Sequence, residues 1–429
     1  MNPLDAMNDE LRNGAGRDIA RGDERARRGE IAGGRGSASR FTTAVLMRER
    51  RRRSARRADA AIVAIGSAVG GHLPQADLAS WVGEFCCETD GQRSFLSRVF
   101  LRAGNEQRSC VMAGPGDDPM AELRAFYPPR SEQNPHGPTT GVRMQRYAIE
   151  APKLAHQAAE QALQRAELLG RQITHLVTVS CTGFFAPGLD CALIESLGLR
   201  SDVSRVHVGF MGCHAAFNAL AIARDMALAD PAAVVLVCCV ELCSLHFASG
   251  WSPEAIVANS LFGDGAAAAI VTQRGWVQPT EAGNSAAGSP WRIRRLASLL
   301  LPDCRGAMTW RIGDHGFEMT LAAEVPAIVK KNLQPWTAAW LGEAKLSADE
   351  VDQWAVHPGG PKVISAVESS LGLAAGKLAT SRKLLAEHGN LSSGSVLQII
   401  QNLPENAGGT CAALGFGPGL MAEGMLLGR

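Results

Sequence analysis

Three polar residues of the chain, Cys213, His357 and Asn390, have types and surroundings that suit covalent catalysis. Cys213 lies in GFMGCHAAFNAL (209–220), where an expected buried strand meets the first turn of an expected helix. Unpaired backbone N–H groups and the helix dipole favour negative charge at such a position. We therefore expect a lowered thiol pKa and a nucleophilic thiolate. The alternative is a packed cysteine that behaves as a small hydrophobic side chain.

The other two residues follow the same pattern in the second half of the chain. His357 lies in WAVHPGGP and Asn390 in EHGNLSSGSV, each beside glycines where an expected strand meets an expected helix. A thiol, an imidazole and an amide together suit acyl transfer, because the sulfur can attack a thioester while the other two groups donate hydrogen bonds to an oxyanion. Taken singly, the alternatives are a core histidine with satisfied ring nitrogens and a helix N-cap asparagine.

Short strands and amphipathic helices alternate from about residue 60 onward. The run 153–170 predicts a helix that ends at Gly170, and it is followed by a strand (ITHLVTVS), a second strand (RVHVGF), a helix from His214 and a third strand (PAAVVLVCCVEL). This order predicts an α/β fold with mixed, largely parallel sheets. A second alternation over 354–420 indicates that the architecture is built twice.

Length, charge and cysteine usage exclude several classes of protein. The chain has 429 residues, 46% of them hydrophobic, and a net charge of +1. No apolar run reaches the ~18 residues of a membrane span, and near-neutral charge is not typical of a protein that binds nucleic acid. Eleven cysteines in apolar surroundings, without paired C-x-x-C units, indicate a reducing cytoplasm and no metal site.

The first 58 residues differ in composition from the rest. Residues 1–60 contain 15 Arg and 9 acidic residues, with no hydrophobic periodicity. We expect a disordered, arginine-rich extension over 1–58. The remainder is expected to form an N-terminal half (59–280) that carries the cysteine and a C-terminal half (281–429) that carries the histidine and the asparagine.

Five motifs together resemble the type III polyketide synthases, the chalcone synthase-like group of the thiolase superfamily. They occur in the family's order and spacing from about residue 60 to the C-terminus: MGCHAAFNAL, LFGDGAAAAIV, HPGGP, GNLSSGSV and GFGPG. The resemblance implies a duplicated αβαβα thiolase-like fold, a homodimer, coenzyme A thioesters as substrates and no further cofactor.

The resemblance also implies a mechanism. An acyl-CoA starter would load onto Cys213, with His357 balancing the thiolate as an ion pair. Malonyl-CoA would then decarboxylate while His357 and Asn390 stabilise the enolate, which attacks the bound acyl group. Repeated extension and cyclisation would give a product of pyrone, resorcinol or phloroglucinol type.

Further residues match positions that shape the family's cavity. Phe262 matches an aromatic gate, with a simple core phenylalanine as the alternative. Met319 stands where plant members have a second gating phenylalanine, and Trp310 where they have glycine. His246, Cys181 and Thr182 match cavity-lining positions. These departures favour a bacterial-type alkylresorcinol or alkylpyrone from an aliphatic starter; a short-chain or aromatic starter is the alternative.

Arg98 and Arg102, one turn apart on an expected helix, match the region where the family binds coenzyme A phosphates. A solvated helix face is the alternative for this pair.

For the whole chain, the alternatives are a type III β-ketoacyl synthase, which condenses once with malonyl groups on acyl carrier protein, and a non-catalytic acyl-binding protein of the same fold. The HPGGP and GFGPG motifs argue against the former, and the buried polar set against the latter.

Overall fold

The computed structural model describes residues 59–273, 289–405 and 407–429, which belong to one compact unit spanning 56–429. The predicted extension (1–58) and the predicted boundary between the halves at 280 and 281 lie outside the described residues. The division into halves therefore stays a prediction. Within the described ranges, no helix combines the length and the apolar character needed to cross a membrane.

Nine strands form one sheet in the order β11-β12-β13-β8-β1-β7-β6-β4-β5. Their bounds are β1 (Ala60–Val69), β4 (His175–Ser180), β5 (Ser204–Gly209), β6 (Val234–Leu242), β7 (Asp264–Gln273), β8 (Trp291–Leu300), β11 (Gln353–Val356), β12 (Thr410–Gly417) and β13 (Met421–Gly428). The sheet consists of two groups of strands: the first is β1, β7, β6, β4 and β5, and the second is β8, β13, β12 and β11. Among the described strands, the groups are joined only by the pairing of β1 with β8, at Ala61↔Arg292 and Ile62↔Trp291.

The predicted mixed α/β architecture is confirmed, but the expected excess of parallel pairing is wrong. Among the described strands of this sheet, three pairings are parallel and five antiparallel. The parallel ones are those the alternating pattern indicated, β4 with β5 and β6, and β11 with β12. The antiparallel ones arise because β7, β8 and β13 return beside earlier strands, a feature that strand patterning alone does not encode.

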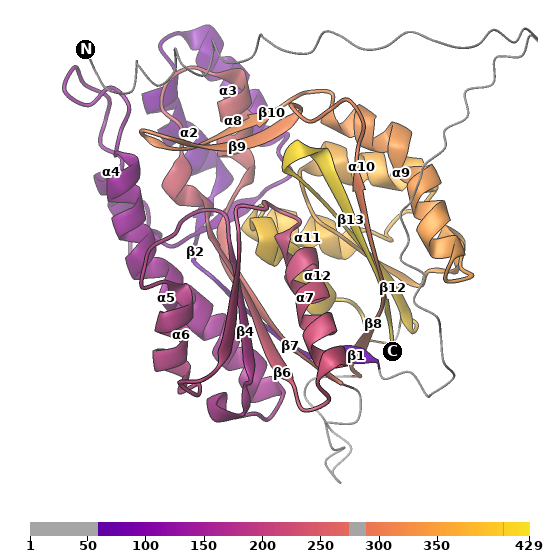
Figure 1. The fold of residues 1–429 in the computed structure, drawn as a ribbon. Coiled ribbons are helices and arrows are strands. Elements are labelled where there is room, and N and C mark those ends of the chain that lie inside the picture. The colour runs from indigo at the N-terminus through magenta and orange to yellow at the C-terminus, as the bar shows by residue number, and fades with distance from the viewer. Residues whose placement is uncertain (1–58, 274–288, 406) are drawn as a thin grey trace, which may run out of the picture. The chain divides into compact units, whose positions relative to one another are not determined.

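The helices form layers around the two groups of strands. Their bounds are α2 (Gln75–Cys86), α3 (Asp90–Leu101), α4 (Ala121–Phe126), α5 (Thr140–Arg165), α6 (Leu189–Leu197), α7 (Ala215–Ala229), α8 (Pro253–Leu261), α9 (Val325–Gly342), α10 (Pro361–Leu371), α11 (Ala379–His388) and α12 (Ser395–Gln401). In Figure 1, α7 lies between β4, β6 and β7 on one side and β8, β12 and β13 on the other. Helix α5 covers the outer face of the first group, and α9 and α10 cover that of the second.

Side chains on alternate positions of a strand explain these layers. In β6, Val235, Val237 and Cys239 pack with α7 in a central core, while Leu236 and Cys238 pack toward α5. Strands buried on both faces read as continuous apolar runs, as VVLVCCV does. The result is the predicted α-β-α-β-α order of layers, with α7 and α12 in the middle.

Two smaller two-stranded sheets complete the framework: β2 (Gly71–Pro74) pairs with β3 (Gln107–Cys110), and β9 (Met308–Gly313) pairs with β10 (Gly316–Leu321) in a hairpin. Both predicted boundaries of one helix are wrong. Helix α5 begins at Thr140 rather than at 153 and ends at Arg165, before Gly170. Pro152 lies inside α5, where proline usually disrupts a helix. The helical turn around Pro152 is stabilised by core packing of buried residues such as Tyr147 and Ala151.

Candidate active site

The turn that carries Cys213 joins β5 to α7. Gly212 precedes the cysteine with φ of 82°, a conformation that favours glycine. A Cβ on Gly212 would lie 2.2 Å from Pro418 Cδ, so the GFGPG segment packs directly on this turn. Position 212 therefore requires glycine for two reasons, the positive φ and the close approach of Pro418. The turn places Cys213 two residues before Ala215, the first residue of α7.

The Cys213 thiol is buried, with 6% of the residue exposed. Burial raises its pKa to about 12, although hydrogen bonds with the Ser392 and Asn390 side chains lower it. The expectation of a lowered thiol pKa is therefore wrong for the thiol by itself. The start of α7 does favour the anion, but loss of solvation is the larger effect.

His357 follows β11, and its backbone N–H donates to Leu414 O at 2.8 Å, which extends the β11–β12 pairing by one residue. The residue is 1% exposed, and among the described residues neither ring nitrogen has a hydrogen-bond partner. Burial, with a smaller effect of neighbouring His214, lowers its pKa to about 3. A core histidine with satisfied nitrogens does not describe this ring, because both nitrogens are unpaired.

Asn390 follows α11, and its backbone is held on both sides by the segment after α8. Its N–H donates to Leu261 O at 2.8 Å, and its carbonyl accepts from Gly263 N at 3.0 Å. Its side-chain Oδ1 accepts from Ser392 N at 2.9 Å. The alternative of a helix N-cap is wrong, because Leu391 and Gly394 occupy the N-cap positions of the short 3-10 helix Ser392–Gly394 and of α12, and the Oδ1 bond instead closes a local turn. This bond orients the amide, whose side chain also hydrogen-bonds Cys213.

Cys213, His357 and Asn390 together line one small cavity of about 20 Å³. A larger cavity of about 330 Å³ also includes Cys213 in its wall. The structure therefore brings together three residues that are far apart in the sequence, and Cys213 contributes to both cavities. An acyl group on Cys213 could therefore extend into the larger cavity while its carbonyl stays near His357 and Asn390.

The six predicted gating and cavity residues all line the larger cavity: Phe262, Met319, Trp310, His246, Cys181 and Thr182. Phe262 and Met319 line the small cavity too, so they stand between the two spaces. Met319 and Trp310 are direct cross-strand partners in the β9–β10 hairpin. Phe262 is half-buried rather than enclosed in the core, which agrees with a place on the cavity wall.

The hairpin is held to the cavity by two side chains. Trp310 Nε1 donates to Cys181 O at 2.7 Å. His246 Nε2 donates to Thr182 O at 2.7 Å, and its Nδ1 accepts from Phe317 N at 2.9 Å. The His246 and Phe317 rings stack with centroids 4.2 Å apart. Burial lowers the pKa of His246 to about 3, so the ring is neutral and both its nitrogens are used in structural contacts.

Comparison with known proteins agrees with this geometry. Residues 47–274 match the N-terminal domain of the chalcone and stilbene synthases, and residues 293–429 match their C-terminal domain. The chain belongs to the chalcone and stilbene synthase family. Members of this family are type III polyketide synthases, acyltransferases that use acyl-CoA and malonyl-CoA.

Named relatives of the synthase come from bacteria. The chain is 33% identical over 358 residues to the alpha-pyrone synthesis polyketide synthase-like Pks18 of Mycobacterium tuberculosis, covering 82% of this chain and 86% of that protein. It is 34% identical over 376 residues to 1,3,6,8-tetrahydroxynaphthalene synthase of Streptomyces peucetius, covering 85% and 92%. The crystal structure of PKS-I from the brown alga Ectocarpus siliculosus is similar with a TM-score of 0.78 and 27% identity, over 88% of this chain and all of that one.

The predicted coenzyme A residues of the synthase lie apart from both cavities. Arg98 is on α3, and Arg102 caps its C-terminal end. Both are exposed, and neither side chain has an ion-pair partner within the part of the chain that the structure describes. They line neither the small nor the large cavity. Their role in phosphate binding stays a prediction.

Sequence reasoning missed a buried carboxylate behind the cavity wall. Glu241 is fully buried and accepts hydrogen bonds from Cys181 N (3.0 Å), Thr182 Oγ1 (2.8 Å) and Ser393 Oγ (2.5 Å). Burial raises its pKa, and these bonds oppose the rise. Ser392 Oγ contacts Cys181 Sγ at 3.5 Å and also hydrogen-bonds Cys213. The available signal was a single acidic residue within the apolar run of β6, because such a residue needs buried partners.

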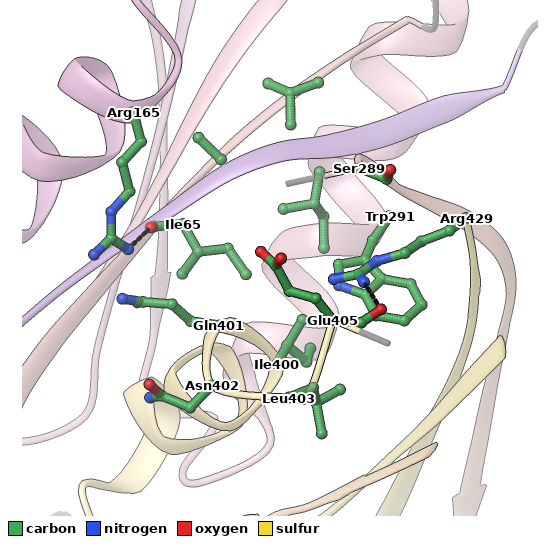
Figure 2. Close-up of a pocket in the computed structure, with 13 residues that line it drawn as sticks. Ile65, Arg165, Ser289, Trp291, Ile400, Gln401, Asn402, Leu403, Glu405 and Arg429 are labelled. Carbon is green, nitrogen blue, oxygen red and sulfur yellow. Dashed lines mark hydrogen bonds between the residues drawn. The ribbon is translucent and has the colours of Figure 1, made fainter. Parts of the chain in front are cut away.

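A separate cavity of about 260 Å³ lies beside residues 62–65 of β1 (Figure 2). Its wall includes Arg165, which donates to Ile65 O, and Arg429, which donates to Glu405 O. The described residues that line it include no cysteine and no histidine. It therefore lacks the thiol and imidazole that acyl transfer of this kind uses, and the site around Cys213 is the candidate active site of the synthase.

Proposed function

We propose that the Cys213 sulfur carries the growing acyl chain. In the loading step, the thiolate attacks the thioester carbonyl of an acyl-CoA starter, coenzyme A leaves as a thiol, and the proton that left Cys213 passes through His357 to it. In the extension step, malonyl-CoA loses carbon dioxide, and the electron pair of the broken C–C bond becomes an enolate. The enolate carbon attacks the carbonyl of the Cys213 thioester, the C–S bond breaks, and the Cys213 thiolate leaves while the acyl group joins the coenzyme A thioester, now longer by two carbons.

One observation carries this proposal: a buried imidazole, with neither nitrogen paired to any described residue, lies in the same small cavity as a thiol and an amide. Leaving buried polar atoms unpaired costs roughly 1–3 kcal/mol each, which a purely structural role does not explain. The N–H of His357 and the amide of Asn390 are available to stabilise the enolate oxygen of malonyl-CoA. Preorganised donors of this kind typically contribute 10²–10³-fold each.

The ion pair between Cys213 and His357 belongs to the same proposal. Burial opposes a lone thiolate and a lone imidazolium alike. Transfer of the proton from sulfur to the ring creates the two charges together, so each compensates the other. The Ser392 and Asn390 side chains, which hydrogen-bond the sulfur, and the start of α7 both stabilise the thiolate, so they favour transfer of the proton from Cys213 to His357.

We further propose an aliphatic starter and an alkylpyrone or alkylresorcinol product. The larger cavity is lined mainly by apolar and small side chains, among them Phe247, Ala248, Ala255 and Ala258. A relative named for alpha-pyrone synthesis supports the same class of product. A phloroglucinol-type product, or a short-chain or aromatic starter, would be seen as a different mass in the same assay.

The remaining features of the proposal concern binding and assembly. Arg98 and Arg102 would contact coenzyme A phosphates, and no cofactor beyond the coenzyme A thioesters is required. A homodimer is supported by the exposed apolar side chains of Phe184 and Met211, which are 42% and 41% exposed near the active-site turn. We place the enzyme in the cytoplasm, since its thiol chemistry suits a reducing compartment.

The proposal is tested by incubating the protein with a fatty acyl-CoA and radiolabelled malonyl-CoA. We expect a labelled pyrone or resorcinol, and a thioester on the Cys213 peptide after a pulse of starter alone. Cys213→Ala should abolish both. Product formation by that variant would refute the covalent mechanism, and product formed only from malonyl groups on acyl carrier protein would favour a β-ketoacyl synthase.

A further inference from the structure

The C-terminal end of α8 is capped by three buried side chains that come from α2 and from the segment around β3. Carbonyl groups at the end of a helix have no partner within it. Here four consecutive carbonyl groups each accept from one of these side chains: Asn259 O from Arg108 Nη1 (2.5 Å), Ser260 O from Gln75 Nε2 (2.9 Å), Leu261 O from Asn105 Nδ2 (3.0 Å) and Phe262 O from Arg108 Nη1 (3.1 Å).

The capped segment is the one that holds Asn390. Phe262 and Asn390 form an isolated parallel bridge, and Leu261 O accepts from Asn390 N at 2.8 Å as well as from Asn105. The space around this bridge is tight: a Cβ on Gly389 would lie 2.9 Å from Leu261 O and 3.1 Å from Arg108 Cγ. A shift in the end of α8 would therefore move Phe262 and Asn390 together relative to Cys213.

The cap is costly for stability. Gln75, Asn105 and Arg108 are 5%, 8% and 2% exposed. Each uses a donor on the α8 carbonyls and leaves other polar atoms buried without a partner: Gln75 Oε1, Asn105 Oδ1, Arg108 Nε and Arg108 Nη2. The Arg108 guanidinium lies between the rings of Phe100 and Phe247, 5.5 Å from each centroid, and burial lowers its pKa to about 10. Apolar side chains could fill this space without unpaired atoms.

We propose that Gln75, Asn105 and Arg108 are positioning residues for the enolate-forming step, acting through the Phe262–Asn390 bridge. The inference rests on the proposed function, because it assigns their effect to the Asn390 amide. A displacement of about 1 Å in a catalytic donor can reduce the rate by about 10²-fold. Loading of Cys213 depends less on that amide, so loss of the cap should slow malonyl decarboxylation more than loading.

Two rates separate this role from a structural one: starter loading on Cys213, followed by mass spectrometry, and carbon dioxide release from malonyl-CoA. For Arg108→Met we expect decarboxylation to fall by about 30-fold and loading by less than three-fold. Arg108→Lys should recover part of the rate, since an ammonium group can still donate to one of the two carbonyls. Gln75→Met should show the same split with a smaller loss, about five-fold.

Gln398→Met is the matched control, because Gln398 is also buried and its Nε2 donates to a backbone carbonyl, Ala266 O at 3.2 Å, outside the cap. It should lower the melting temperature without changing the ratio of the two rates. If Arg108→Met does not fold, Asn105→Leu takes its place. The inference is overturned if the cap variants that fold keep the parental ratio, or if Gln398→Met changes it equally. A parent enzyme that never loads Cys213 would instead refute the proposed function.

Discussion

Two buried histidines face the active-site spaces in different ways. His246, in the wall of the larger cavity, donates from Nε2 and accepts at Nδ1, so its neutral ring is fully used. His357, in the small cavity, has no partner at either nitrogen within the part of the chain that the structure describes. Burial lowers the pKa of both to about 3. The two rings thus share burial, and they differ in whether their polar atoms are available to a substrate.

The difference shows that hydrogen bonding, rather than burial or pKa, separates the two roles. A neutral imidazole has one donor and one acceptor. His246 uses both to fasten the β9–β10 hairpin, whereas His357 keeps both for chemistry. Substitutions at the two positions should therefore have opposite profiles in activity and stability.

The largest expected effect is on activity. His357→Ala removes a donor to the enolate oxygen, and malonyl decarboxylation should fall by about 10²–10³-fold. The rate of carbon dioxide release measures this, with His246→Gln as the comparison. An equal or larger loss in His246→Gln would contradict the division of roles.

A reversed order is expected for stability. His246→Gln loses the paired contacts to Thr182 and Phe317, and its free energy of unfolding should fall by roughly 1–3 kcal/mol. His357→Gln breaks no side-chain hydrogen bond among the described residues, so urea denaturation should give it a smaller loss. The comparison fails if His357→Gln is the less stable variant.

A third expected difference concerns Cys213 itself. Because burial opposes a lone thiolate, the sulfur should depend on His357 to receive its proton. Alkylation of Cys213 by iodoacetamide at pH 7.5 should be about ten-fold slower in His357→Gln than in the parent. Mass mapping of the peptide is needed, since other cysteines are present. An unchanged rate would show that the thiolate forms without the imidazole.

The smallest effect is a pH dependence. Burial keeps the His246 ring neutral in the folded protein down to about pH 3, whereas a histidine takes up a proton near pH 6.5 in the unfolded chain. The unfolded state therefore binds more protons between these values, and stability should fall as pH drops below about 6.5. His246 adds at most about 1.4 kcal/mol per pH unit to this slope. His246→Gln should flatten the slope between pH 6.5 and 5, and an identical slope would count against a neutral His246.

Much of the fold and of the site could be predicted from the sequence. Cys213, His357 and Asn390 each lie beside glycines at the end of an apolar run, so local patterning placed them at turns, and the structure brings them to one cavity. The strands and helices of the parallel units were also predicted. Helix α5 was predicted too short at its start, because its first turns are held by contacts with the sheet rather than by sequence periodicity.

Features that depend on distant contacts could not be predicted. The sign of the Cys213 pKa shift follows from burial by segments far along the chain, which outweighs the local effect of α7. The cap on α8 joins residues near 75 and 105 to residues near 260, and no local pattern connects them. Glu241 was hidden because an acidic residue in an apolar strand has partners that only the folded chain defines.

The contact between Gly212 and Pro418 restricts how chimaeras can be made from this enzyme and its relatives. A turn that carries the nucleophile, taken from one parent, fits a C-terminal segment from another only if the turn has glycine at the position of Gly212 and the segment places its proline ring no closer than Pro418 does. Chimaeras that exchange the two parts should therefore be designed with this contact inherited from a single parent.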